Sequence, residues 1–313
     1  MDLNCTPCGR ADPTAAPAGV SPGMVAASRC IDAAAATAYI LGRQCPQGGF
    51  SFYRTPQWGV EEPNALDTYA AVAALRLLGV EVPQAQRIGS WLSTLQRDDG
   101  SWPSLTVAWA CCEALALLGQ TPRVDPGGWL RRLWHGRLAS IQTTGREWRG
   151  TLIDLHRLAQ LIQRFAPDAI GQERSRLQHL LDAALADDGA WAAPGADLES
   201  SGAAVELAGR AGLTIDHTRL AAWWRRCEDP VLGLRLTPSA WVTSAGALGG
   251  GLTVARCLGV PLRYPQAVCR QLHLLQQPSG GFSARHQALV SLWDTWLALC
   301  TAACLAPELP AHA

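Results

Sequence analysis

Apolar residues recur along this chain every three to four positions, in segments of two alternating kinds. The segments 65–78 and 107–118 consist almost wholly of apolar or small residues, whereas the segment 84–96 places Ile88 and Leu92 on one face only. A period near 3.6 residues predicts α-helices. Because a helix without a polar face has to be buried and an amphipathic helix can border water, we expect an inner and an outer layer of helices.

The same pattern continues through the chain and predicts helices in six pairs. Several of these helices end at a Leu-Gly step, as at Gly79, Gly119 and Gly259, and successive ends lie roughly 40–47 residues apart, the spacing of a two-helix repeat. Strand patterns are nearly absent, so the sequence predicts an all-α repeat protein. The predicted pairs are 23–42 with 65–78, 84–96 with 107–118, 126–142 with 151–165, 172–186 with 199–211, 217–227 with 240–258, and 265–277 with 289–304.

A short motif, Gln-x-x-x-Gly-x-aromatic, precedes the second helix of three of these pairs. It occupies residues 44–50, 96–102 and 276–282, and a worn copy without the glutamine lies at 187–191. The glutamine can bond backbone groups left unpaired at a helix end. The glycine turns the chain where a Cβ would clash, and the aromatic ring fills the gap between neighbouring pairs. Three such copies predict a helical repeat architecture.

The overall composition narrows the class of function. Lys plus Arg and Asp plus Glu both number 26 in the 313 residues, so the net charge is zero and a basic face for nucleic acid is not expected. Apolar residues make up 48% of the chain, but no uncharged run reaches the roughly 18–20 residues of a membrane span. The 13 Trp against 4 Phe favour an aromatic-lined cavity.

The 11 cysteines are odd in number and scattered, often within predicted helices. This distribution favours reduced, buried thiols in a cytoplasmic protein, and the N-terminal residues lack a signal-peptide pattern. Cys5 and Cys8 form the single C-x-x-C, without a second pair or a histidine nearby, so we expect no metal or redox role for them. Both lie in a leader, predicted to be flexible at residues 1–22, ahead of a single domain at 23–313.

Over roughly residues 25–305 these repeats resemble the α/α-toroid family, which includes squalene–hopene cyclases, class II diterpene cyclases and protein prenyltransferase β subunits. The resemblance implies an (α/α)6 toroid, a double ring of helices around a central apolar cavity. A closed ring also suits the last helix, which ends apolar and lacks the polar face of a solenoid cap. Because the repeat motif is structural, the resemblance specifies the fold more closely than the reaction.

Three aspartates share one register near the start of predicted inner helices. When these helices are aligned on their ends, Asp67, Asp154 and Asp294 fall at corresponding positions. In a ring they would surround one mouth of the central cavity. An aspartate near a helix N-terminus is favoured by the helix dipole and by capping. The alternative is a carboxyl group that faces an apolar pocket, has a raised pKa and acts as an acid.

The catalytic motif of the class II cyclases is incomplete in this chain. These enzymes carry Asp-x-Asp-Asp at about this register, and the middle Asp protonates an alkene or epoxide. Here the window is 64–67, where only the last Asp is present and Leu66 stands in the donor's place. Asp67 or Asp294 would then have to supply the proton, held poorly solvated until it is transferred.

The zinc ligands of the protein prenyltransferases are also missing. Alignment of the repeats places Ser104 and Thr106 where those enzymes have Asp and Cys, and Asp294 where they have His. We therefore expect no metal and no zinc-thiolate transfer. An Asp-rich motif for Mg²⁺ is not evident either, so Mg²⁺ would enter as a cofactor only with a diphosphate substrate.

Two further sets of residues are candidates for substrate binding. Arginine and histidine side chains in loops before inner helices could hold a diphosphate, although they could equally be solvated charges. Aromatic rings on or near inner helices could stabilise a carbocation, although core packing would also explain them. The basic candidates are Arg54, Arg285 and His286, and the aromatic candidates are Tyr69, Trp109, Trp148, Trp241 and Trp293.

The sequence therefore favours a terpene-cyclase-like enzyme, an isomerase or lyase that acts on an isoprenoid or other small apolar substrate by acid-initiated cyclisation or isomerisation. Three alternatives stay open. One is an enzyme of the same fold with a non-terpene natural-product substrate. Another is a toroid that binds a lipid or a partner without catalysis. The third is a subunit that needs a partner chain or forms a homodimer.

Overall fold

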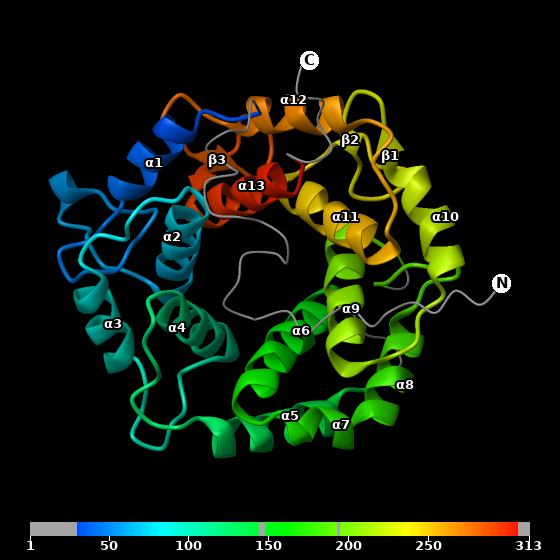
Figure 1. Ribbon diagram of the computed structural model, residues 1–313, viewed down its shortest axis with the longest axis horizontal. Coiled ribbons are helices and arrows are strands. Elements are labelled where there is room, and N and C mark those ends of the chain that lie inside the picture. The colour runs from blue at the N-terminus through cyan, green and yellow to red at the C-terminus, as the bar shows by residue number, and fades with distance from the viewer. Residues whose placement is uncertain (1–29, 144–147, 193–194, 306–313) are drawn as a thin grey trace.

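The computed structural model describes residues 30–143, 148–192 and 195–305, and these form a double ring of helices (Figure 1). The predicted leader, with Cys5 and Cys8, lies outside the described residues. The inner ring consists of α2 (Ala65–Leu77), α4 (Leu105–Leu117), α6 (Trp148–Phe165), α9 (Leu198–Ala211), α11 (Ala245–Leu258) and α13 (Leu292–Leu305). The outer ring consists of α1 (Ala33–Leu41), α3 (Ala85–Thr94), α5 (Gly127–Ser140), α8 (Arg174–Ala184), α10 (His217–Cys227) and α12 (Pro265–Leu275).

Each inner helix packs against the inner helices before and after it, and α13 packs against α2, so the inner ring is closed. Each outer helix covers the inner helix that follows it. The main core lies between the two layers, where the largest fully buried side chains include Trp134, Trp223 and Trp224. The all-α (α/α)6 toroid predicted from the repeats is therefore confirmed.

The local sequence sets the ends of the inner helices. At the start of α4, the Ser104 Oγ accepts a hydrogen bond from the Val107 N–H at 3.2 Å and so satisfies one of the unpaired donors of the first turn. At the end of α11, Gly259 adopts a φ of 64°, a left-handed conformation that glycine reaches without steric cost. These signals recur around the ring, which is why helix ends repeat along the sequence.

The motif glutamines join each repeat to the next. The Gln96 side chain is 4% exposed, and its amide donates to the carbonyl oxygens of Gly100 at 3.2 Å and Val124 at 2.8 Å. Its own carbonyl oxygen accepts from the Val124 N–H at 3.0 Å. One buried amide therefore fixes the turn after α3 and also the segment that leads into α5.

The same bridge closes the ring between its last and first repeats. The Gln276 amide donates to the carbonyl oxygens of Gly280 at 3.0 Å and Asp32 at 2.8 Å, and its oxygen accepts from the Asp32 N–H at 2.7 Å. Gly280 has a φ of +90°, and a Cβ there would overlap the backbone of Ala35 in α1. Glycine is required at this corner because the chain passes so close to the first helix.

Two corners without the motif glutamine use other side chains for the same bridge. In the worn copy Leu185 stands at the glutamine position, and Gln178 instead exchanges two hydrogen bonds with the Thr214 backbone at 3.1 and 3.2 Å. In the fifth repeat the buried Glu228 accepts from the Arg263 N–H at 2.7 Å. Because a carboxylate cannot donate, Arg225 supplies the donor, to Pro261 at 3.0 Å. The sequence analysis did not identify the bridge at Glu228.

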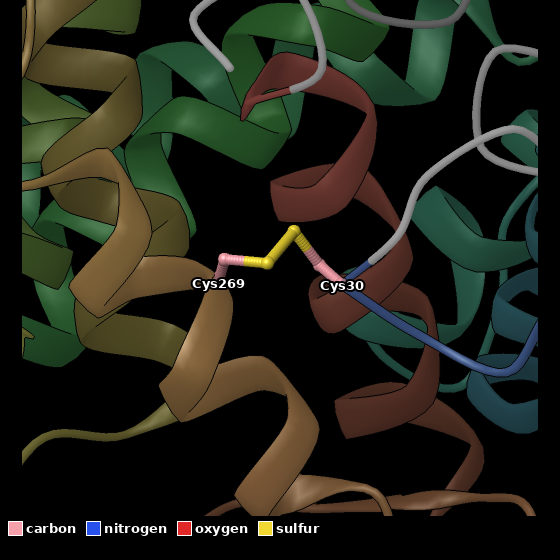
Figure 2. The surroundings of a disulfide bond; sticks show 2 residues. All are labelled: Cys30 and Cys269. Carbon is pink, nitrogen blue, oxygen red and sulfur yellow. A yellow bond between two sulfur atoms is a disulfide. The ribbon is translucent and has the colours of Figure 1, made fainter. Parts of the chain in front are cut away.

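A disulfide between Cys30 and Cys269 adds a covalent link at the point of ring closure (Figure 2). It ties the segment before α1 to α12, 239 residues apart in sequence. The expectation that the cysteines are reduced is wrong for this pair. Five other cysteines are free thiols: Cys45, Cys111, Cys112, Cys227 and Cys300. A cytoplasmic location stays a prediction, and the disulfide weighs against it because oxidising compartments favour such bonds.

Some boundaries differ from those predicted. The helix expected at 240–258 begins at Ala245, since Ser244 caps it and the preceding residues form a loop. The helix expected at 172–186 is preceded by a separate short helix, α7 (Asp168–Gln172). Loops carry a 3-10 turn, η1 (Pro56–Trp58), and two small hairpins, β1 (Glu228–Asp229) with β2 (Gly233–Leu234) and β3 (Phe282–Ser283) with β4 (Val290–Ser291).

None of the helices in the described ranges has the length and apolarity to cross a membrane.

We predict that Gln96→Ala destabilises the protein by about 2–4 kcal/mol, because it leaves two buried carbonyl groups and one N–H without partners. The measurement is urea unfolding followed by circular dichroism. Gln47→Ala is the matched control, since Gln47 lies in a corner of the same kind but is exposed. Equal stability of the two variants would contradict the bridging role of Gln96.

We also predict that Cys269→Ser lowers the unfolding temperature under oxidising conditions. A cross-link between distant residues removes conformational entropy from the unfolded chain, which for a loop of this size is worth about 3–5 kcal/mol. In dithiothreitol the wild type and the variant should unfold at nearly the same temperature. If the two already coincide without reductant, the disulfide makes no contribution to ring closure.

Candidate active site in the centre of the ring

Four aromatic side chains from three inner helices meet inside the ring. The Tyr69 ring of α2 lies 4.6 Å from that of Trp109 in α4 and 5.2 Å from that of Trp296 in α13, both edge to face. Trp293, also in α13, lies 4.8 Å from Trp296 and 6.1 Å from Trp109. Tyr69 and Trp109 are buried, and the two α13 tryptophans are half-buried. We call these four residues the aromatic cluster.

An arginine from the opposite side of the ring reaches this cluster. The Arg157 guanidinium carbon lies 4.9 Å from the Trp109 ring centre and 5.5 Å from that of Trp293. Arg157 belongs to α6, which stands three positions away from α13 in the six-membered inner ring. The contact with Trp293 therefore spans the centre of the ring at this level. Nearby, the Trp109 indole N–H donates to the Gln160 Oε1 at 2.6 Å.

Beyond the aromatic cluster, towards the C-terminal ends of the inner helices, the side chains are charged. Arg164 of α6 pairs with Glu113 of α4 at 3.2 Å, and Arg210 of α9 donates to Gln163 at 2.7 Å and pairs with Glu206. Burial raises the pKa of Glu113, and the Arg164 charge opposes that shift. The ring interior is thus more polar than the apolar cavity that the sequence predicted.

Asp67 is buried at the first turn of α2 and is committed to the local fold. Its Oδ2 accepts from the Phe52 N–H at 3.0 Å and from the Asn64 side chain at 2.6 Å. Burial raises the pKa of this carboxyl group, while the two hydrogen bonds act to lower it. Asp67 therefore holds the loop before α2 against the start of that helix.

Asp294 occupies the corresponding place in α13 but is less constrained. It is half-buried, and its Oδ2 accepts from the Ser291 hydroxyl at 2.5 Å. Burial raises the pKa of Asp294, the Ser291 hydrogen bond opposes the rise, and the Glu199 charge adds to it. Asp294 follows Trp293 in the first turn of α13, so an acid with a raised pKa lies in the same helix turn as one residue of the aromatic cluster.

Asp154 does not join the other two aspartates. Helix α6 begins at Trp148, so Asp154 lies in its second turn, whereas Asp67 and Asp294 lie in the first turns of α2 and α13. The Asp154 carboxylate pairs with Arg137 of the outer helix α5 at 2.7 Å. The predicted group of three aspartates at one mouth is therefore reduced to Asp67 and Asp294.

The predicted basic residues lie in loops rather than in the ring interior. Arg54 pairs with Glu61 at 2.8 Å and donates to the Gly42 carbonyl at 3.1 Å, so it braces the loop between α1 and α2. Arg285 and His286 are exposed in the turn between β3 and β4. None of the three contacts the aromatic cluster through a described interaction, and their role towards a diphosphate stays a prediction.

Two of the predicted aromatic residues are placed apart from the cluster. Trp241 is 91% exposed in the loop before α11, because that helix starts five residues later than its sequence suggested. Trp148 is buried at the first turn of α6. Tyr69, Trp109 and Trp293 do meet inside the ring, and Trp296 completes the group.

Residues on α6 and in α1 were not predicted from the sequence. Arg157, Gln160 and Arg164 are spaced by three and four positions on an inner helix, which makes a polar stripe at helical spacing. Burial raises the pKa of Tyr39 to about 12; the charges of Asp67 and Asp294 add to this rise, and Arg43 opposes it. The Tyr39 hydroxyl is buried. No local pattern would have marked that tyrosine.

Among the described residues, no group of three or more His, Cys, Asp or Glu could hold a metal ion.

Comparison with known proteins supports the same architecture. The model of the prenyltransferase α/α-toroid domain matches residues 22–147, a range that includes α1 to α5. No curated protein matches this chain. Residues 22–147 are thus similar to a prenyltransferase α/α-toroid domain, and α1 to α5 within this range form helix pairs of the ring.

Proposed function

We propose that this protein is an enzyme that protonates an isoprenoid-like substrate inside the ring and so starts a cyclisation or an isomerisation. The observation that carries the proposal is the Asp294 carboxyl group, half-buried and with a raised pKa, in the same helix turn as the cluster residue Trp293. An alkene is a weak base, so the acid that protonates it has to be poorly solvated. Asp294 meets this requirement.

Among the three predicted acids, Asp294 is the best proton donor. Asp67 accepts two hydrogen bonds that stabilise its ionised form, and Asp154 is paired with Arg137. The described residues give Asp294 hydrogen bonds at one carboxyl oxygen only, from Ser291. Its other oxygen is therefore available to carry the proton towards a substrate.

The aromatic cluster would bind the hydrocarbon part of the substrate and stabilise positive charge that develops on it. Indole and phenol rings attract a cation to their faces, and those of Tyr69 and Trp296 are not covered by Arg157 through any described contact. The match of residues 22–147 to a prenyltransferase-type domain supports an isoprenoid substrate. The proposed step uses a protein carboxyl group alone, and Mg²⁺ would be a cofactor only with a diphosphate substrate.

We predict that Asp294→Asn lowers turnover of the active substrate at least about 100-fold, the usual contribution of a general acid. Candidate polyprenyl substrates are incubated with the protein in D2O, and products are analysed by mass spectrometry for one deuterium at the protonated carbon. Asp187→Asn, at an exposed corner, is the matched control and should retain wild-type turnover. Deuterium incorporation that is unchanged in Asp294→Asn would contradict the assignment.

The raised pKa also predicts a pH dependence. Because the donor has to be protonated, kcat/KM should fall as the pH rises through the pKa of Asp294, which lies above the ordinary aspartate value. Ser291→Ala removes the hydrogen bond that opposes this rise, so the inflection should move to higher pH. An inflection that stays in place would show that another group titrates.

A binding protein without catalysis is the second candidate, and one observation favours it. Arg157 crosses the ring to Trp293, so side chains occupy the centre at the level of the aromatic cluster. Such a ring could hold a ligand against this layer without transforming it. In the D2O experiment, saturable binding by the wild type with no product of any kind would support this function over the first.

A further inference from the structure

Arg157 differs from the other charged residues of the ring interior in its partners. Its described contacts are the faces of Trp109 and Trp293 and one long hydrogen bond of 3.4 Å to the Thr106 hydroxyl. Burial lowers the pKa of the guanidinium, which the Asp154 charge and the Tyr69 hydroxyl only partly offset. Within the described ranges no carboxylate forms an ion pair with it. A guanidinium has five donors, and the described protein contacts of Arg157 engage one of its nitrogens in a hydrogen bond.

The neighbouring carboxylates are already engaged with other arginines. Asp154 pairs with Arg137 at 2.7 Å, and Glu113 pairs with Arg164 at 3.2 Å. Farther round the ring, Glu206 serves Arg210 and Arg256, and Glu199 pairs with Arg149. These four carboxylates therefore each have a cation of their own. A half-buried guanidinium without an ion-pair partner favours a ligand that supplies the opposite charge.

We propose that Arg157 binds the carboxylate of an apolar monocarboxylic acid whose hydrocarbon part lies against the aromatic cluster. A planar carboxylate fits the guanidinium fork with two parallel hydrogen bonds. The flanking rings of Trp109 and Trp293 hold the fork in place and offer an apolar surface next to it. This inference rests on the proposed function for the isoprenoid-like body of the ligand, and it adds the chemical nature of the head group.

The single positive charge of Arg157 favours a ligand with one negative charge over a neutral ligand or one with several negative charges. A neutral hydrocarbon would cover the half-buried guanidinium without supplying a counterion. A diphosphate carries about three negative charges, and at the level of the aromatic cluster Arg157 is the one cation of the described residues without a carboxylate partner. The charges of a single carboxylate and of the Arg157 guanidinium compensate each other.

Three ligands that share one carbon skeleton test the proposal: farnesoic acid, farnesol and farnesyl diphosphate. Binding to the full-length protein is measured by titration calorimetry at fixed ionic strength. Wild type should bind the acid at least about tenfold more tightly than the alcohol, the range of a charged hydrogen-bonded pair. Arg157→Gln should lose this preference and keep its affinity for farnesol, whereas Arg157→Lys should retain part of it. Arg132→Gln, on the exposed face of α5, is the matched control and should bind like wild type.

Several outcomes would overturn the proposal: equal affinities of wild type for acid and alcohol, a preference that survives in Arg157→Gln, tighter binding of the diphosphate than of the acid, or no binding of the acid. The farnesol affinity of Arg157→Gln also reports whether that variant is folded. Titrations with Asp294→Asn separate this proposal from the proposed function. That variant should bind the acid normally even where its turnover is lost, so either proposal can fail without the other.

Discussion

The fold depends on a side-chain amide, or its substitute, at corners between successive repeats. A ring of helix pairs has few long-range backbone hydrogen bonds, so something else has to fix the angle from one pair to the next. Gln96 does so with three hydrogen bonds, and Gln276 does the same between the last repeat and the first. Glutamine suits this place because its amide can donate and accept at once.

The ring directs the remaining polarity into its centre. Positions on the outer side of the inner helices are mostly taken up by the core between the layers, so several polar side chains of α6 and α9 point inward. Arg164 and Arg210 find side-chain partners there. Arg157 lies against indole faces instead of a carboxylate. Arg164 and Arg210 are thus paired within the protein, whereas Arg157 is the cation that we propose binds a ligand.

The fold was predictable because its signals are local and repeated. Each Gln-Gly-aromatic corner and each apolar helix can be recognised from a few adjacent residues. The number of helix pairs, six, then predicts that α13 closes the ring by packing against α2. The site was predictable only in part. Asp294 shares the first-turn register of Asp67, as predicted, but Asp154 was misplaced because α6 begins at Trp148, six residues before it. Arg157 and the Cys30–Cys269 bond depend on contacts across the ring, which no local pattern encodes.

The acid at Asp294 and the unpaired cation at Arg157 constrain each other. A carbocation formed on the aromatic cluster would lie within a few ångströms of the guanidinium that covers Trp109 and Trp293, and in a poorly solvated site like charges at that distance repel strongly. A bound carboxylate would cancel the guanidinium charge before the proton is transferred. Binding of the head group would then be a condition for the chemistry, because the same cluster cannot stabilise a new cation while it faces an uncompensated one.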